Sequence, residues 1–166
     1  MPMMMIFVLV VIALIVVVGI TAGQSLMSQG RVGNTTQDIA EIAANVEGAY
    51  ANQATFAGLS NSLAISQKLV PANMVQGGTS IVDPFGGAVT LQPDGTVPNG
   101  FDIQVGGLGN ASCAAVAEDI SAFEIEINGT VAASANASVS PSTAGTDCTA
   151  GTGANTVTAV ETQTNG

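Results

Sequence analysis

The first 29 residues of the chain contain no charged side chain, and Arg31 is the first charged residue. Residues 3–20 are an almost unbroken run of Met, Ile, Phe, Val, Leu and Ala. A run of about 18 apolar residues is long enough to cross a bilayer as a helix. This segment therefore requires burial, either in lipid or against other apolar surface.

A cleaved secretory signal is one alternative, because Ala22 and Gly23 are small residues of the kind found at cleavage sites. Such a signal has basic residues before its apolar core, and here no Lys or Arg precedes the run. The run also continues into a helical pattern instead of an irregular segment. We therefore favour a retained apolar helix over residues 1–30, acting as a membrane anchor or filament core.

The helical pattern extends well beyond the apolar run. Apolar side chains recur at steps of three and four at Ile39, Ile42, Val46, Ala49 and Tyr50. This spacing is typical of an amphipathic helix with one buried stripe. The sequence predicts one long helix from near Met1 to about Gln53, apolar all round in its first half and one-sided in its second.

Two glycines interrupt the apolar segment at Gly19 and Gly23. Their four-residue spacing would allow close helix–helix approach through a small-residue face. A local unwinding of the helix is a second interpretation, and tolerated glycines without a special role are a third.

Charge excludes one class of function. Twelve acidic residues against two basic ones give a formal net charge of −10. Nucleic-acid binding requires clustered Lys and Arg to neutralise phosphates, so we predict none by the head.

Catalytic and metal-binding motifs are also missing from the sequence. Histidine is absent, and no GxSxG, HExxH or phosphate-loop motif occurs. Glu124 and Glu126 alternate with apolar residues and are typical of the solvated face of a strand. Calcium binding by Asp83, Asp94 or Asp102 has only weak support, so we predict no enzyme, no metal ligand and no cofactor.

The two cysteines, Cys113 and Cys148, fall in the polar C-terminal part of the chain. One intrachain disulfide between them suits an oxidising compartment, and two free buried thiols are the alternative.

The remaining sequence, 31–166, predicts one globular head that includes the amphipathic half of the long helix. Ser60 is a candidate N-cap of a short helix that Pro71 ends, and Ser112 is a candidate N-cap of another. Residues 71–87 read as a loop, and residues 131–155 as a polar irregular tract tied back by Cys148. Strands are predicted at 88–91, 101–105, 123–127 and 156–160. The fold class is therefore α+β, with a long N-terminal α-helix packed against a small antiparallel sheet of about four strands.

The order of these parts resembles the type IV pilins, and among them the type IVb subunits of thin conjugative and adhesive pili. The resemblance rests on the helix ending near Tyr50, Leu69-Val70-Pro71 with Met74, Asp83-Pro84-Phe85-Gly86-Gly87 before Val89, the pair Cys113 and Cys148, and Asn155-Thr156-Val157.

The resemblance implies a structural role as the major subunit of an extracellular pilus, serving attachment, conjugation or motility. A prepilin peptidase would leave Met1 as an N-methylated terminus, and the subunit would wait in the inner membrane. Assembly machinery would then build a homo-polymer whose core contains Ile6, Phe7, Leu9, Val10, Ile12, Leu14, Val17 and Ile20.

The chain departs from the family pattern at two points. Most type IV pilins have a glutamate at the fifth mature position, where this chain has Met5, so the usual charge pair with a neighbouring terminal amine is in question. The proline that commonly bends the helix is also absent, which leaves Gly19 and Gly23 as candidates for unwinding. A membrane-anchored periplasmic binding module and a secretion-system pseudopilin remain the alternative functions.

Overall fold

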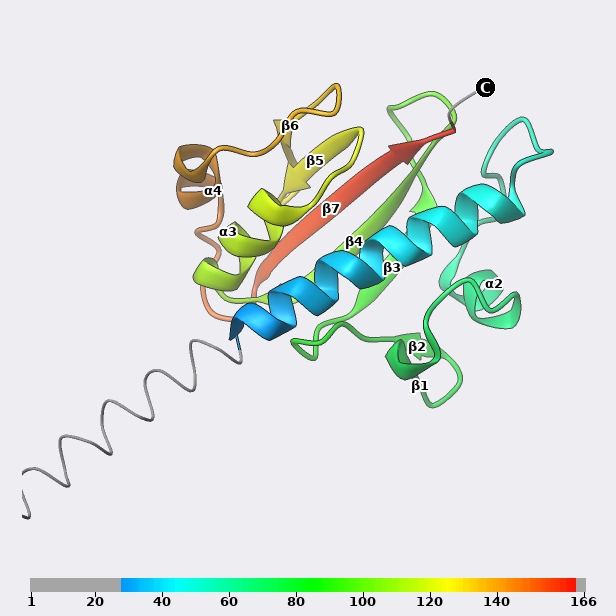
Figure 1. Ribbon diagram of the computed structural model, residues 1–166, viewed down its shortest axis with the longest axis horizontal. Helices are drawn as coiled ribbons and strands as arrows, with labels where there is room; N and C mark the ends of the chain where they lie inside the picture. Colours follow the sequence, from blue (N-terminus) through cyan, green and yellow to red (C-terminus); the bar gives the residue numbers. More distant parts are fainter. Residues whose placement is uncertain (1–27, 164–166) are drawn as a thin grey trace, which may run out of the picture. The chain divides into compact units, whose positions relative to one another are not determined.

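Residues 28–163 are described in the computed structural model of the protein. Two compact units are distinguished, residues 1–31 and 32–166. The first described helix covers residues 28–49, and Figure 1 shows this helix and the elements of the second unit. The elements after it are α2 (Asn61–Ser66), the 3₁₀ turn η1 (Ala72–Met74), β1 (Val75–Gln76), β2 (Ser80–Ile81), β3 (Val89–Pro93), β4 (Gly100–Leu108), α3 (Asn110–Asp119), β5 (Glu124–Ile127), β6 (Thr130–Ala133), α4 (Pro141–Asp147) and β7 (Asn155–Thr162).

Helix 28–49 ends a little before the predicted boundary at Gln53. Its last turn tightens, because the amide of Ala51 bonds to Gly48 and the amide of Gln53 bonds to Tyr50, each three residues back. Within residues 28–163, no helix is both long and apolar enough to cross a membrane. The membrane-spanning prediction concerns residues before this range.

Helix α2 begins as predicted and ends earlier than predicted. The Ser60 side chain accepts a hydrogen bond from the Leu63 amide at 3.2 Å, which confirms its role as N-cap. Lys68 then adopts a left-handed φ of 56°, and the amide of Leu69 bonds to the carbonyl of Ala64. This pattern closes a helix before its sequence pattern ends, so Pro71 is not the residue that stops it.

The sheet is antiparallel throughout and has the strand order β3-β4-β7-β5-β6. All four predicted strands are present, and the C-terminal strand β7 lies at the centre, as Figure 1 shows. The predicted count of about four is too low, because β6 adds a fifth strand after the Asn128-Gly129 turn. The predicted loop 71–87 also contains the small hairpin of β1 and β2.

One face of the sheet forms the core with helix 28–49. Residues paired across antiparallel strands point to the same face. The buried rows are Leu91, Ile103, Ala159 and Ile125, and beside them Val89, Val105, Val157 and Ile127. They belong to the same core cluster as Ile39, Ile42 and Val46 of the helix. The predicted stripe is therefore the surface that joins helix and sheet.

Helix α3 begins earlier than the sequence suggested. Its N-cap is Gly109, and the Cys113 amide makes the first helical bond to the Gly109 carbonyl at 2.8 Å. Ser112 lies inside the helix, so its predicted role as N-cap is wrong. The tract predicted as irregular contains α4, whose N-cap Ser140 accepts from the Thr143 amide and is followed by Pro141 at the first helical position.

Candidate functional site

The head holds residues 32–49 of the helix by polar contacts as well as by the core. Near one end, the Thr36 hydroxyl donates to a carboxylate oxygen of Asp119 on α3 at 2.8 Å. In the middle, the Asn45 side chain donates to the Leu69 carbonyl at 3.1 Å. Beyond the other end, Gln163 after β7 donates to the Tyr50 carbonyl. These contacts fix this segment to the head along its length.

Several predicted site residues precede the described residues 28–163. They are the N-methylated terminus Met1, the fifth position Met5, the helix-unwinding candidates Gly19 and Gly23, and the filament-core positions Ile6, Phe7, Leu9, Val10, Ile12, Leu14, Val17 and Ile20.

The expected disulfide between Cys113 and Cys148 is present, with the two Cα atoms 5.8 Å apart. Cys113 lies in α3, and Cys148 is the residue that ends α4. Both are buried in the core. The bond therefore holds the polar segment that contains α4 against α3.

Asn155, at the start of β7, connects its strand to two segments that are distant in the sequence, the β4–α3 junction and the β5–β6 turn, and to the loop just before it. It is fully buried. Its amide nitrogen donates to the Leu108 carbonyl, the Asn110 side chain and the Gly151 carbonyl at 3.2, 2.8 and 3.1 Å. Its side-chain oxygen accepts from the Ala150 amide and from Asn128, each at 3.0 Å. No local sequence signal marks this role, because the partners of Asn155 lie mostly in other segments of the chain.

The Asp83-Pro84-Phe85-Gly86-Gly87 segment forms a tight turn before β3. One carboxylate oxygen of Asp83 accepts from the amides of Phe85 and Gly87 at 2.8 and 3.0 Å. A Cβ at Gly87 would lie 1.9 Å from the carbonyl oxygen of Gly106 on β4. A side chain cannot be accommodated there, so this turn depends on its final glycine.

Carboxylates gather on the opposite face of the sheet. Asp102 is buried beside Val160 and accepts from Gln92 on β3 at 3.0 Å. Burial, with smaller contributions from Asp94 and Glu126, raises the pKa of Asp102 to about 6. Glu124 and Glu126 are half-buried there instead of fully solvated, because they flank the central strand β7. The prediction of a solvated strand face is therefore met only in part, since both residues lie opposite the core but are half-buried.

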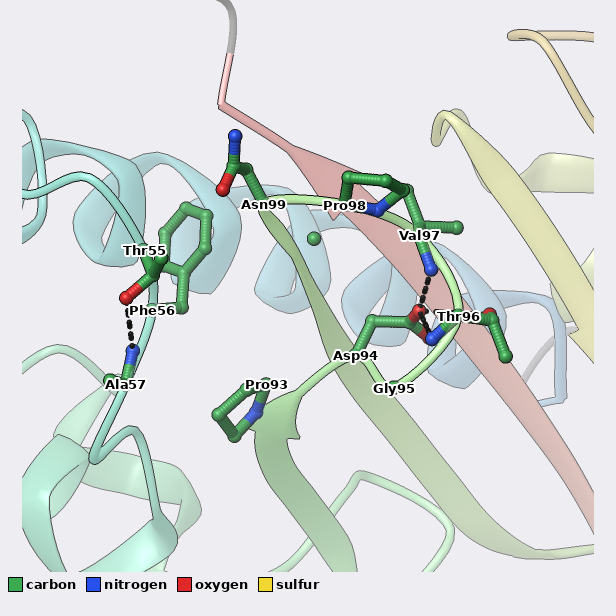
Figure 2. A pocket seen from close by; sticks show the side chains of 11 residues that line it. Thr55, Phe56, Ala57, Pro93, Asp94, Gly95, Thr96, Val97, Pro98 and Asn99 are labelled. Carbon is green, nitrogen blue, oxygen red and sulfur yellow. Dashed lines mark hydrogen bonds between the residues drawn. The ribbon is translucent and has the colours of Figure 1, made fainter.

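The β3–β4 loop and residues 55–57 line an open pocket of about 480 Å³, drawn in Figure 2. In the loop, Asp94 accepts hydrogen bonds from the amides of Thr96 and Val97. Burial alone would raise the pKa of Asp94, but these bonds and one from Asp102 lower it. The Asp94 carboxylate is therefore occupied in shaping the loop.

Residues 28–163 contain no group of three His, Cys, Asp or Glu side chains placed to hold a metal ion. The side chains of Asn155, Asn128 and Asp94 each make at least three hydrogen bonds, most of them to backbone groups of the head. Their geometry serves to hold turns and strands together.

Comparison with known proteins shows which family and fold the chain resembles. Residues 30–162 match the family described as PilS N terminal. No curated protein is significantly similar to the chain. A type IV b pilin from Salmonella typhi is similar in structure, with a TM-score of 0.62 and 21% identity over 78% of this chain and 99% of that pilin. TcpA, a type IV pilin from the Vibrio cholerae El Tor biotype, has a TM-score of 0.57 and 18% identity over 80% of this chain and 99% of its own.

Both solved pilin chains are matched over almost their whole length. At these identities the likeness concerns the fold, and the family match concerns the sequence over most of the chain. Together with the helix packed on an antiparallel sheet, they identify the chain. The protein belongs to the PilS N-terminal family and has the fold of the type IVb pilins.

Proposed function

We propose that this protein is the major structural subunit of an extracellular type IV pilus, assembled as a homo-polymer through its apolar N-terminal segment. Its role is structural and not catalytic. In this proposal the unassembled subunit resides in the inner membrane, a prepilin peptidase processes it to a methylated Met1, and pilus machinery builds the filament.

One observation carries the proposal. Helix 28–49 buries a single stripe in the head, and the sequence that precedes it, 3–20, is apolar on all sides. The head is joined to this apolar segment, and the segment must be buried in lipid or against other apolar surface. Identical subunits satisfy that need by packing these segments against one another, with their heads outside.

Energetics indicate how assembly would proceed. Burial of each large apolar side chain from water contributes roughly 1.5–3 kcal/mol, so a dozen exceed an association cost of about 4–15 kcal/mol. From lipid this gain largely disappears, because acyl chains are as apolar as the filament core. Polymerisation would therefore depend on packing, on contacts between heads and on an energy-driven machine. Met5 carries no charge, so the usual charge pair with a neighbouring terminal amine would not contribute.

Electron microscopy of sheared surface material, with mass spectrometry of its principal band, tests the proposal. We expect thin filaments made of this chain, with Met1 methylated. A detergent-soluble monomer and no filaments would contradict it and favour the membrane-anchored binding module. Filaments seen only on overexpression would favour the pseudopilin.

A variant pair separates assembly from folding. Leu14→Asp places a charge in the proposed core and should abolish filaments, because burying an unpaired charge is costly. Ser62→Asp adds the same charge to the exposed surface of α2 and should assemble normally. The melting temperatures of the two purified subunits should be the same. A normal yield of filaments from Leu14→Asp would contradict the proposed filament core.

A further inference from the structure

Two carboxyl groups meet at the end of the β3–β4 hairpin, on the face of the sheet opposite the core. Gln92 of β3 pairs with Asp102 of β4, and the amide of Asp94 bonds to the carbonyl of Gly100 at 2.9 Å. Residues two apart on a strand share a face, so Asp94 lies diagonally beside Asp102. A side-chain hydrogen bond joins the two carboxyl groups. Because ionised carboxylates only accept hydrogen bonds, this bond requires one proton on the pair.

Asp102 is the buried member of the pair. It is only 8% exposed. Gln92 donates to its Oδ2 at 3.0 Å, whereas its Oδ1 is buried and, as a bare carboxylate oxygen, has no hydrogen donor among the residues that the structure describes. A proton on Oδ1 turns this oxygen into a donor, with the Asp94 carboxylate as its acceptor. One proton thus satisfies the buried oxygen.

Asp94 connects the pair to the β3–β4 loop, residues 94–99. Its Oδ1 accepts hydrogen bonds from the amides of Thr96 and Val97 and from the Thr96 hydroxyl (Figure 2). Most other side chains of the loop are exposed. The position of the Asp94 carboxylate therefore determines the shape of the loop.

The charges that act on Asp102 within the described part of the chain are negative. They belong to Asp94 in the loop and to Glu126 on β5. Glu124 lies in the same cross-strand row as Asp102, on the other side of Val160. Neither of the two basic residues of the chain is among the groups that act on Asp102. No cation thus compensates Asp102 when it ionises.

We propose that one proton shared by Asp94 and Asp102 holds the β3–β4 loop on the sheet, and that loss of this proton releases the loop. Without the proton, two negative charges lie in direct contact and repel each other. Asp102 belongs to the nine-residue strand β4, which is paired on both sides, whereas Asp94 belongs to an exposed loop. The loop is therefore the part that moves. This inference concerns the folded head and does not depend on filament assembly.

The pKa values of the two groups move apart. Burial, and to a smaller degree Asp94 and Glu126, raise the pKa of Asp102 to about 6, although the hydrogen bond from Gln92 opposes the shift. Burial also acts to raise the pKa of Asp94, but hydrogen bonds from the loop and from Asp102 lower it. Asp102 therefore carries the proton and Asp94 the charge. The loop is held below a pH of about 6 and released above it.

Release of the loop changes one surface of the head. The loop and residues 55–57 line the open pocket of about 480 Å³ in Figure 2. The Phe56 ring below is buried and packs on Phe101, with ring centroids 4.5 Å apart. Because this contact is apolar, we expect it to persist when the carboxylates ionise. The pH-dependent change is then confined to the loop side of the pocket.

The test follows NMR signals of the full chain in detergent, isotope-labelled at the backbone amides and the aspartate carboxyl groups. We expect the carboxyl signals of Asp94 and Asp102 to titrate as a coupled pair, with a step at about pH 6. The amide signals of Thr96 and Val97 should move with the same midpoint. Their exchange with water, corrected for its intrinsic pH dependence, should increase at least about tenfold. Titration of Asp102 near its ordinary pKa of 3.8 would overturn the inference.

Two variants test the pair from its two sides. Asp102→Asn places a permanent amide donor beside Asp94, so the signals of Thr96 and Val97 should stay at their low-pH positions throughout the titration. Asp94→Asn keeps an acceptor for the loop amides and removes one of the two charges. In that variant Asp102 should titrate below its parent midpoint, and the loop amides should no longer follow the pH.

Glu161→Gln is the matched control. Burial raises the pKa of Glu161, on the opposite face of the sheet, to about 7, so this group titrates in a similar range without contacting the loop. The signals of Thr96 and Val97 should titrate in Glu161→Gln as they do in the parent. If they keep their midpoint in both Asp102→Asn and Asp94→Asn, or lose it in Glu161→Gln, the inference is overturned, because another group then controls the loop.

Discussion

Glu161 of β7 pairs with Phe101 of β4 on the face of the sheet that helix 28–49 covers. A carboxyl group thus lies at the edge of the apolar core. Burial, and to a smaller degree the charge of Glu47 on the helix, raise the pKa of Glu161 from 4.5 to about 7, although a backbone hydrogen bond with Phe123 opposes the shift.

This burial predicts that the head becomes more stable as the pH falls from about 8 to about 5. The folded state binds the proton of Glu161 more tightly than the unfolded chain does. The free energy of unfolding therefore falls as the pH rises from about 4.5, the ordinary pKa, through the folded pKa of about 7. Glu161→Gln should raise stability near pH 8 and flatten the pH dependence. Urea unfolding at several pH values measures both effects, and an equally steep dependence in Glu161→Gln would contradict the assignment.

The disulfide predicts a measurable loss of stability on its removal. In the chain-entropy model, the Cys113–Cys148 bond, with a separation of 35 residues, contributes about 3–4 kcal/mol. The Cys113→Ala, Cys148→Ala double variant should lose about this much in urea unfolding. Reduction of the parent should expose residues 113–148 to limited proteolysis, whereas reductant should not affect the double variant. Unchanged protease resistance of the reduced parent would count against the prediction.

Asn155 should be among the most sensitive polar positions of the head. Asn155→Ala leaves the buried carbonyl of Leu108 and the amide of Ala150 without partners, each costing about 1–3 kcal/mol. We expect a total loss of about 3 kcal/mol or more in urea unfolding. Asn155→Asp should also destabilise, because an oxygen would then face the Leu108 carbonyl. The control Asn52→Ala, at an exposed site, should change stability by less than about 0.5 kcal/mol.

Two glycines should respond in opposite directions to the same substitution. Gly87→Ala should cost at least about 3 kcal/mol, because its Cβ would collide with the Gly106 backbone. Gly48→Ala should stabilise by about 0.5–1 kcal/mol, since Gly48 is exposed in helix 28–49 and a Cβ there meets nothing within 4 Å. Thermal unfolding of the two variants compares them directly, and a stable Gly87→Ala would show that the turn and β4 can separate.

Elements with one buried face were predictable because their periodicity is visible in the sequence. The helix stripe from Ile39 to Val46 and the alternation in 123–127 each record a surface packed against the core. Short motifs were equally reliable where they concern residues close together in the chain, as at the Ser60 N-cap and the Asn128-Gly129 turn.

Elements stabilised mainly by contacts with distant residues show no such periodicity in the sequence. Strand β6 is exposed on much of its surface, with Val131 50% exposed, and it exists because β5 offers hydrogen bonds. Helix α4 is short and rich in Ser, Thr and Gly, and its position depends on Cys148 and α3. Intrinsic propensity could not predict either element, because tertiary contacts supply the stabilisation.

An apolar N-terminal segment that continues into an amphipathic helix and an α+β head could be read from the residues alone, because hydrophobic periodicity requires a buried face. Tertiary packing alone places β7 at the centre of the sheet and brings Asn155 to the β4–α3 junction and the β5–β6 turn. It also brings Asp38 and Asp83 to the lining of one pocket. These relations depend on how segments far apart in the chain pack together, which no local pattern records.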